Sequence, residues 1–344
     1  MDLSVTFLGT GGPVPTALRG TASVLVTRGG EKLMFDCGEG TQRQLRRSLG
    51  LVQVDELYLT HFHLDHCLGL PGLLKTYDLN DRTEPMRLLG PVGLGRLMDD
   101  FSPLVGRLGY HLEIEELRPG QIVPHRDYEI EAIPVEHRTT ALGYALLEDD
   151  RPGKLDPDEA GRLGVESGPE LGALQAGETV TGSKGEVTPE QVMGEDRPGR
   201  AVVITGDTGP CAAVAEAATD ADLLVHDSSF ITADAERAAE TGHSTSAQAA
   251  GVASEAGAKM LALVHISARY HVKEALDEAT VVFASAVAPR DFDLVELPYP
   301  ERGEPELVRD GARRDDPAGG APEGDSTEAD PPAASPAEDA SRTG

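Results

Sequence analysis

The stretch THFHLDHCLGL, residues 60–70, concentrates four side chains that can bind a metal within six positions. These side chains are His61, His63, Asp65 and His66. Imidazole nitrogens and carboxylate oxygens are suitable ligands for zinc and neighbouring metals. The apolar run at 56–60 predicts a short buried strand before them, and residues 68–74 predict the start of a helix after them. Ligands in a loop that leads from a strand into a helix converge beyond the end of the strand, where open α/β sheets bind their ligands.

A histidine-rich surface loop is the alternative interpretation of this stretch, and further ligands at the ends of other strands would argue against it. Apolar runs predict four such strands, at 32–35, 129–135, 201–205 and 260–264. The residues that end or closely follow them are Asp36, His137, Asp207 and His265. Any one of these could be a turn residue or a helix cap. Their occurrence beside HxHxDH in one chain favours a shared metal site.

The motifs of this chain, in order, resemble those of tRNase Z, a tRNA 3′-processing endoribonuclease family with the metallo-β-lactamase fold. The resemblance runs from about Leu3 to about Val295 and includes FLGTGGPVP, FDCGEGTQRQL, GLPGLL, EHRTTALGYAL, GDTGP, GHSTSAQAA and HISARY. HxHxDH alone indicates only the superfamily. FDCGEGTQRQ, GHST and HISARY together are specific to the nuclease.

The resemblance implies a centre with two zinc ions (Zn²⁺) per subunit. The ligands of the first zinc would be His61, His63, His137 and Asp207. The ligands of the second would be Asp65, His66, Asp207 and His265, so that Asp207 bridges. Two metal ions about 3.5–4 Å apart can clamp the attacking and leaving oxygens of a phosphodiester. Asp36 would orient the ligand histidines from outside, or cap the helix that starts near Gly40.

Three residues are expected to move protons. Asp65 can accept the proton of the attacking water. His243, in GHST, would donate a proton to the leaving 3′ oxygen, although it could also be an ordinary polar residue before a helix. The family has Glu in the partner position of His243, and Asp227 stands there in this chain. Because Asp is one methylene shorter, we expect a backbone shift or a water to remake the contact between Asp227 and His243.

Substrate-binding residues are expected on three segments. Arg43 and Arg46 belong to the densest basic cluster outside the C-terminal segment, although they could also line a solvated helix face. Arg269 lies in the HISARY motif. Residues 151–199 are rich in Gly, Pro and acid and predict an inserted, flexible tRNA-binding arm. Gly168 and Pro169 resemble the Gly- and Pro-containing part of that arm, although its basic character is missing.

The composition is strongly acidic, with a net charge of −29 and no Trp. This charge opposes RNA binding, because phosphate contacts from Lys and Arg usually supply the affinity. An acidic chain with few lysines is typical of proteins adapted to molar salt, where the Debye length falls to about 3 Å. RNA recognition would then depend on shape, metal coordination and a few local arginines.

Residues 301–344 predict an acidic disordered tail, because they are rich in Pro, Gly, Ala and acid. Residues 1–300 are expected to form a single catalytic domain, since both halves of the chain supply ligands. Three cysteines without framework spacing indicate a reduced compartment. The sequence has neither a recognisable signal peptide nor an apolar stretch long enough to span a membrane. We therefore expect a cytoplasmic protein.

The expected fold is α/β (α+β): a metallo-β-lactamase αβ/βα four-layer sandwich of two mixed β-sheets flanked by helices, with a protruding arm. Strands are expected near 3–8, 22–27, 32–36, 57–60, through 112–147, and at 201–205, 222–226 and 260–264. Helices are expected near 40–48, 68–78, 92–100, 210–218, 244–256 and 272–284.

The expected function is that of a zinc endoribonuclease that removes the 3′ trailer from precursor tRNA and leaves a 3′ hydroxyl on the tRNA. The resemblance also implies a homodimer. Two alternatives remain at this stage: another hydrolase on the same scaffold, such as a phosphodiesterase or an arylsulfatase-like enzyme, and a noncatalytic RNA-binding scaffold.

Overall fold

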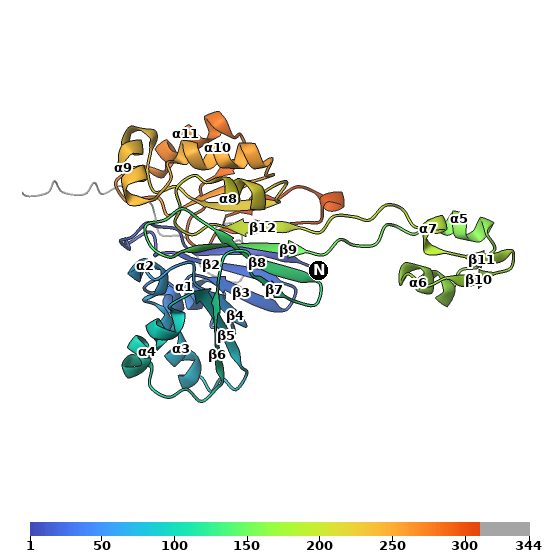
Figure 1. The fold of residues 1–344 in the computed structure, drawn as a ribbon, viewed down its shortest axis with the longest axis horizontal. Helices are drawn as coiled ribbons and strands as arrows, with labels where there is room; N and C mark the ends of the chain where they lie inside the picture. Colours follow the sequence, from blue (N-terminus) through green and yellow to red (C-terminus); the bar gives the residue numbers. More distant parts are fainter. Residues whose placement is uncertain (310–344) are drawn as a thin grey trace, which may run out of the picture. The chain divides into compact units, whose positions relative to one another are not determined.

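The computed structural model describes residues 1–309. Its main feature is a pair of sheets packed face to face, with helices on both outer faces (Figure 1). The predicted αβ/βα sandwich is therefore confirmed. Within the described residues, every helix is too short or too polar to cross a membrane.

The first sheet has eight strands and contains most of the N-terminal half of the chain. Strands β3 to β6 are parallel, so their C-terminal ends lie at one edge. In spatial order the strands are β17 (Glu306–Val308), β16 (Leu294–Glu296), β1 (Leu3–Gly9), β2 (Ser23–Arg28), β3 (Glu31–Phe35), β4 (Glu56–Tyr58), β5 (Met86–Pro91) and β6 (Leu112–Leu117).

The second sheet has seven strands, four of which are parallel. Strands β12 to β15 run in the same direction, and β9 joins them antiparallel through β12. In spatial order the strands are β15 (Ala286–Val287), β14 (Leu261–Val264), β13 (Leu223–Asp227), β12 (Ala201–Ile204), β9 (Leu142–Glu148), β8 (Tyr128–Pro134) and β7 (Ile122–Pro124).

Three hydrophobic cores hold these layers together. The central core lies between the sheets and includes Phe35, Tyr58 and Tyr144, whose rings are in mutual contact. One outer core lies under α1 (Thr41–Ser48), α2 (Leu64–Cys67), α3 (Leu70–Leu79) and α4 (Leu94–Val105). The other lies under α8 (Ala212–Ala217), α10 (Ser246–Ala256) and α11 (Val272–Val282), and is rich in alanine. Helix α9 (Ala235–Thr241) precedes α10 in the chain. Short 3₁₀ helices are at η1 (Thr232–Asp234) and η2 (Pro300–Arg302).

The predicted arm has secondary structure of its own. It contains α5 (Pro157–Arg162), α6 (Pro169–Gln175), the hairpin β10 (Val180–Gly182) and β11 (Gly185–Val187), and α7 (Pro189–Val192). In Figure 1 these elements form a group apart from both sheets. The weak periodicity of residues 151–199 did not predict them, because helices of four to seven residues contain too few turns to show a hydrophobic period.

The predicted start of the tail at residue 301 is wrong. Residues 306–308 form β17, which pairs with β16, and Leu307 packs against the central core. In this short edge strand Glu306 is exposed, whereas Leu307 is half-buried. The composition of the surrounding sequence nevertheless resembles that of a disordered segment. Residues 310–344 of the predicted tail lie outside the described residues.

Candidate metal centre

The predicted ligand residues lie where the two sheets end at the same edge. His61 follows β4, and Asp207 and His265 follow the parallel strands β12 and β14. Because parallel strands end at one side of a sheet, residues distant in sequence meet there. The two sheets are joined at this edge by hydrogen bonds: Tyr144 donates its hydroxyl to the carbonyl of Leu59 at 2.7 Å, and a backbone bond of 2.9 Å joins residues 142 and 60.

The first group of ligand candidates is His61, His63, His137 and Asp207. The Nε2 of His61 lies 2.9 Å from the Nδ1 of His63, and the Nε2 of His137 lies 3.4 Å from the same Nδ1. The Oδ2 of Asp207 lies 3.7 Å from the Nε2 of His61. One ligand atom from each residue lies within 4.8 Å of the others, so the four can surround a single cation.

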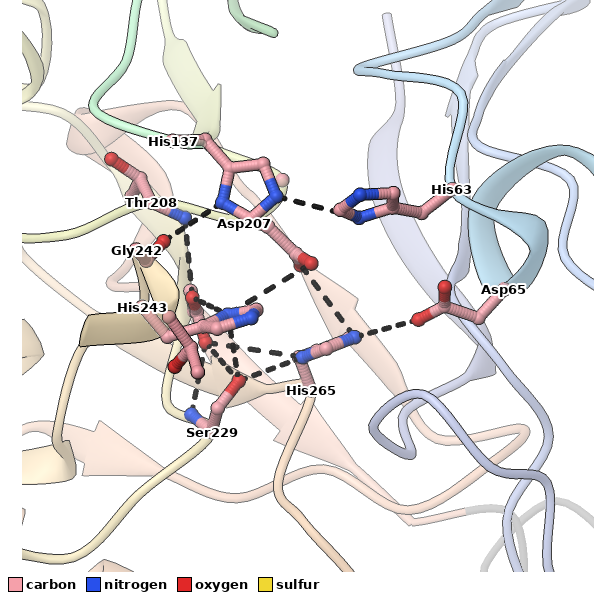
Figure 2. A network of polar contacts seen from close by, with 12 residues as sticks. His63, Asp65, His137, Asp207, Thr208, Ser229, Gly242, His243 and His265 are labelled. Atoms are coloured by element: carbon pink, nitrogen blue, oxygen red, sulfur yellow. Dashed lines mark hydrogen bonds and ion pairs between the residues drawn. The ribbon is translucent and has the colours of Figure 1, made fainter. Parts of the chain in front are cut away.

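The second group is Asp65, His66, Asp207 and His265, also with ligand atoms within 4.8 Å of one another. The Nε2 of His66 lies 3.3 Å from the Oδ1 of Asp207 and 3.4 Å from the Oδ2 of Asp65. The Nε2 of His265 lies 3.6 Å and 3.0 Å from the same two oxygens. Figure 2 shows His63 and Asp65 projecting toward His137, Asp207 and His265 from the opposite side.

Asp207 belongs to both groups, with Oδ2 toward the first and Oδ1 toward the second. Its Oδ1 and the Nε2 of His66 are buried and have no hydrogen-bond partner among residues 1–309. An unsatisfied buried polar atom costs about 1–3 kcal/mol. A pair of divalent cations would satisfy both atoms, so the donor set fits a dinuclear site.

The other ring nitrogens of the ligand histidines are mostly held by neighbours. The Nδ1 of His66 lies 2.7 Å from the Oδ2 of Asp36, and Thr60 donates its backbone N–H to the Oδ1 of the same carboxylate. Asp36 thus contacts a predicted ligand histidine, as the orienting role proposed for it requires, and it does not cap α1. The Nδ1 of His137 lies 2.8 Å from the carbonyl of Gly242. Such contacts fix ring orientation and raise ligand basicity.

His243 and Asp227 are in direct contact, without the bridging water that was one of the two expected possibilities. The Nδ1 of His243 lies 2.7 Å from the Oδ2 of Asp227. Asp227 is the last residue of β13, which points its short side chain straight at the loop before α10. The contact therefore forms without the longer side chain of Glu.

Ser229 links this pair to the second ligand group, and sequence reasoning missed it. Its hydroxyl lies 2.6 Å from the Oδ1 of Asp227, 2.7 Å from the Nδ1 of His265 and 3.2 Å from the Nδ1 of His243. The only local signal was its place two residues after Asp227, where an Asp side chain commonly accepts a hydrogen bond from the backbone N–H, as it does here at 2.9 Å. Figure 2 shows Ser229 between His243 and His265.

The backbone is strained or tightly packed at several of these positions. Asp36 and His265 both have φ of 60°, a conformation that costs non-glycine residues about 1–3 kcal/mol and persists only where the surroundings enforce it. Gly38 approaches so closely that an added Cβ would lie 2.2 Å from the carbonyl oxygen of Asp65. Gly206, with φ of 62°, would place a Cβ 2.6 Å from Thr60. The glycines of FDCGEG and GDT thus allow the two halves of the site to approach each other.

The electrostatics of the site favour the metal-binding protonation states of His61, Asp65 and Asp207. Burial alone would lower the pKa of His66 and of His265, but the charge of Asp207 raises both, so these two rings would have to lose a proton on binding a metal. Burial lowers the pKa of His61 well below its ordinary value, and His66 lowers it further. Burial alone would raise the pKa of Asp65, but its hydrogen bond with His265 and its close contact with His66 lower it far below the usual range. Burial would likewise raise the pKa of Asp207, but the positive charges of His265 and His66 lower it. Neutral imidazoles and ionised carboxylates are the forms that bind a metal.

The pKa of His243 is raised to about 9. Burial alone would lower it, but the hydrogen bond and charge of Asp227 outweigh burial. The imidazole of His243 therefore carries a proton at neutral pH, in contrast to His61.

The predicted substrate-binding residues are not gathered at the metal ligands. Arg43 and Arg46 lie on α1 and line a cavity of about 320 Å³ with Arg47. Arg269 is exposed in the loop after His265. Gly168 and Pro169 begin α6 in the arm.

The family model described as metallo-beta-lactamase superfamily matches residues 16–249. Ribonuclease Z of Haloferax volcanii is 47% identical over 305 residues, which cover 87% of this chain and 96% of the relative. Ribonuclease Z of Halobacterium salinarum is 47% identical over 306 residues, with coverage of 88% and 99%. Ribonuclease Z of Myxococcus xanthus is 49% identical over 270 residues, with coverage of 78% and 88%.

Among solved structures, that of human tRNase Z, short form, is similar to this chain with a TM-score of 0.63. It is 27% identical in sequence, and the match covers 86% of this chain and 99% of the human one. The metallo-beta-lactamase fold protein YhfI from Bacillus subtilis also has a TM-score of 0.63, but at 19% identity it supports the fold alone.

Proposed function

The chain belongs to the ribonuclease Z family of the metallo-β-lactamase superfamily, as an endoribonuclease that processes tRNA 3′ ends, and we propose that two zinc ions per subunit support its reaction. The observation that carries this proposal is the pair of four-residue ligand groups that share Asp207. Mixed His and carboxylate ligands suit zinc. The first zinc would be held by the group containing His61 and the second by the group containing His265.

The reaction would be attack of water on the phosphodiester at the 3′ end of the tRNA, with cleavage of the bond from phosphorus to the 3′ oxygen. When bound, the metal pair would polarise the phosphate and make water a stronger nucleophile at neutral pH. Asp65 would accept the proton of that water. Its contacts with His66 and His265 use Oδ2, so Oδ1 is available for this proton.

His243 would donate a proton to the departing 3′ oxygen. Its Nδ1 is engaged by Asp227 and Ser229, and its Nε2 has no hydrogen-bond partner within residues 1–309. A ring held at one nitrogen presents the other in a fixed direction, as a general acid requires. The tRNA would then keep a 3′ hydroxyl, and the trailer would keep the phosphate.

The substrate would be precursor tRNA, bound by the arm and by local cations in an otherwise acidic protein. Residues 151–199, with Gly168 and Pro169 at the start of α6, would contact the tRNA, and Arg43, Arg46 and Arg269 would contact phosphates nearer the cut. The remainder of residues 1–309 would form one catalytic domain. The protein would act as a cytoplasmic homodimer at high salt, where its net charge of −29 is screened.

The test uses the full chain at high salt with one precursor tRNA, with and without a chelator, and with metal analysis of the purified protein. Two zinc ions per chain and chelator-sensitive release of a trailer are expected. Asp65→Ala should abolish cleavage, whereas Asp100→Ala, an exposed acid on α4, should leave it unchanged. Cleavage that survives metal removal would overturn the proposal. So would a metal-loaded protein that leaves the precursor intact and hydrolyses only small phosphodiesters.

A further inference from the structure

The arm is connected to the rest of the chain by a narrow two-stranded ribbon. Arg151 and Arg197 pair across it, each donating its backbone N–H to the other's carbonyl at 2.8 Å. The strands approach so closely that a Cβ on Gly153 would lie 2.0 Å from the carbonyl oxygen of Gly194. This ribbon is where the direction of the arm is set.

The arm has its own hydrophobic core, so the cores of the sheets do not hold it. Its buried members are Ala160, Val165, Leu174, Val187 and Val192. Within residues 1–309, none of these belongs to the three cores of the main body. The orientation of such a module depends on the contacts at its root.

The root is contacted by the segment that follows β16. Arg151 donates through Nη1 and Nη2 to the two carboxylate oxygens of Glu301, at 2.8 and 3.0 Å. Arg197 donates through Nη1 to the Oε1 of Glu301 at 3.0 Å. One carboxylate thus binds both strands of the ribbon. A two-pronged pair of this kind fixes direction as well as distance.

Tyr299 adds a second contact from the same segment. The guanidinium of Arg151 lies 3.5 Å from the centre of the Tyr299 ring, and that of Arg200 lies 3.9 Å from it. Arg200 is almost wholly buried and donates to the carbonyls of Leu297 and Met1 at 2.7 and 3.0 Å. The ring therefore connects a cation of the ribbon to a cation fixed in the body.

We propose that Tyr299 and Glu301 form an arm clamp that holds the ribbon at Arg151 and Arg197 and thereby positions the arm for precursor tRNA. The inference rests on the proposed function, because it takes the arm to be the part that contacts the substrate. Tyr299 and Glu301 are positioning residues, and they act through the arm without touching the reacting atoms.

Contacts of this type remain effective at high salt. At about 1 M the Debye length is about 3 Å, so interactions between separated charges are largely screened. The N–O distances of 2.8–3.0 Å in the arm clamp lie within that length. The contact of a guanidinium with an aromatic face is partly a packing contact, which salt does not remove. Contacts made by Arg151 and Arg197 can therefore still fix the orientation of the arm at high salt.

The experiment compares Tyr299→Ala, Glu301→Gln, Tyr299→Phe and the control Glu304→Gln in the full metal-loaded chain. Glu304 is exposed and lies in the same segment, so its variant makes the same charge change outside the arm clamp. For each protein, kcat and KM are measured with precursor tRNA, and the rate is measured with bis(p-nitrophenyl) phosphate, which is too small to reach the arm. Thermal melting checks the fold.

Loss of one clamp contact should raise KM for precursor tRNA by about three- to fivefold. The kcat, and the rate with the small phosphodiester, should stay within twofold of wild type, because the metal centre is untouched. Tyr299→Phe keeps the ring face and should behave as wild type, as should Glu304→Gln.

Three results would overturn the inference while wild type still cleaves the precursor. An unchanged KM in both Tyr299→Ala and Glu301→Gln would show that the arm does not depend on these contacts. Equal losses with both substrates would indicate a general structural role. A Tyr299→Phe variant as weak as Tyr299→Ala would remove the ring face from the explanation. A wild-type protein that leaves the precursor uncut would instead refute the proposed function.

Discussion

The metal centre and the ion-pair cluster of Arg28, Glu148 and Arg200 both bury charged groups, but only the second is satisfied by the chain itself. In the ion-pair cluster, Glu148 accepts from Arg28 at 2.8 Å and from Arg200 at 2.7 and 2.8 Å. The side chains are 1–4% exposed. Opposite charges are present together, and the remaining donors of Arg200 reach backbone carbonyls.

In the metal centre, by contrast, like groups face one another. The ring nitrogens of His61, His63 and His137 converge, and the carboxylates of Asp65 and Asp207 lie beside His66 and His265. In the part of the chain that the structure describes, one buried polar atom each of Asp207 and His66 has no hydrogen-bond partner. The comparison teaches that burial of charge does not by itself mark a functional site. What distinguishes the metal centre is that several metal-binding side chains converge and that two of their buried atoms have no hydrogen-bond partner within residues 1–309.

The largest expected effect is that of Asp207→Ala, which removes a ligand from both groups. Loss of an outer contact to a ligand costs about 10–100-fold in metal affinity or activity. Loss of a ligand shared by two sites should therefore lower cleavage of precursor tRNA by about 10⁴-fold or more. Metal content should fall with it, measured by elemental analysis after dialysis, while circular dichroism should remain that of the folded protein. Retention of both metals would contradict the bridging role.

The next largest effect is a loss of stability on substitution of Glu148 in the ion-pair cluster. Glu148→Gln leaves Arg200 buried without its carboxylate, whereas Arg28 keeps Asp127 at 2.9 Å. Removal of one partner of a buried pair costs about 3–5 kcal/mol. Denaturant unfolding at neutral pH should show this loss, whereas Glu131→Gln on the neighbouring strand β8 should show little. Cleavage at temperatures well below unfolding should be unaffected. A loss under about 1 kcal/mol would place this cluster with ordinary surface ion pairs.

The difference in stability between wild type and Glu148→Gln should also depend on pH. Burial alone would raise the pKa of Glu148, but hydrogen bonding to Arg200 and the charges of Arg200 and Arg28 lower it. The unfolded pKa of Glu is about 4.3. Because the folded pKa is lower, the contribution of Glu148 is complete above that value and is lost as pH falls through the folded pKa. The stabilities of wild type and Glu148→Gln should therefore converge toward acid pH.

Much of the metal centre could be predicted from sequence, because its ligands are placed by local rules. A buried strand followed by His or Asp, as at His61, Asp207 and His265, is visible in a single window. The fold follows from the same strands, since parallel strands bring their ends to one edge. The contacts that orient the ligands were less accessible. Gly242 contacts His137 through a carbonyl, which every residue possesses, so nothing in its side chain signals the role.

Contacts between distant charged residues were also not predictable. Arg200 and Glu148 flank the arm in sequence, and neither lies in a motif. Their pairing depends on β9 and β12 being neighbours in the second sheet, which no local pattern specifies. The way in which Asp227 reaches His243 was left open for a similar reason. The length of a side chain was compared with that of Glu without knowledge of the backbone, and the backbone already brings His243 within 2.7 Å.

The smallest expected effect is that of a substitution at Ser229. It tests whether metal affinity depends on the residues that hydrogen-bond to the metal ligands. Ser229→Ala removes the hydroxyl that contacts both Asp227 and the Nδ1 of His265, and leaves every ligand in place. Metal affinity on the side of His265 should fall by about tenfold, the lower end of the effect of such partners. Competition with a chelator measures this loss. The matched control is Ser254→Ala, which makes the same change at an exposed position of α10. If Ser229→Ala binds both metals as wild type does, then the strained backbone of His265 suffices to orient its ring. The hydrogen bond from Ser229 would then not be needed for metal binding.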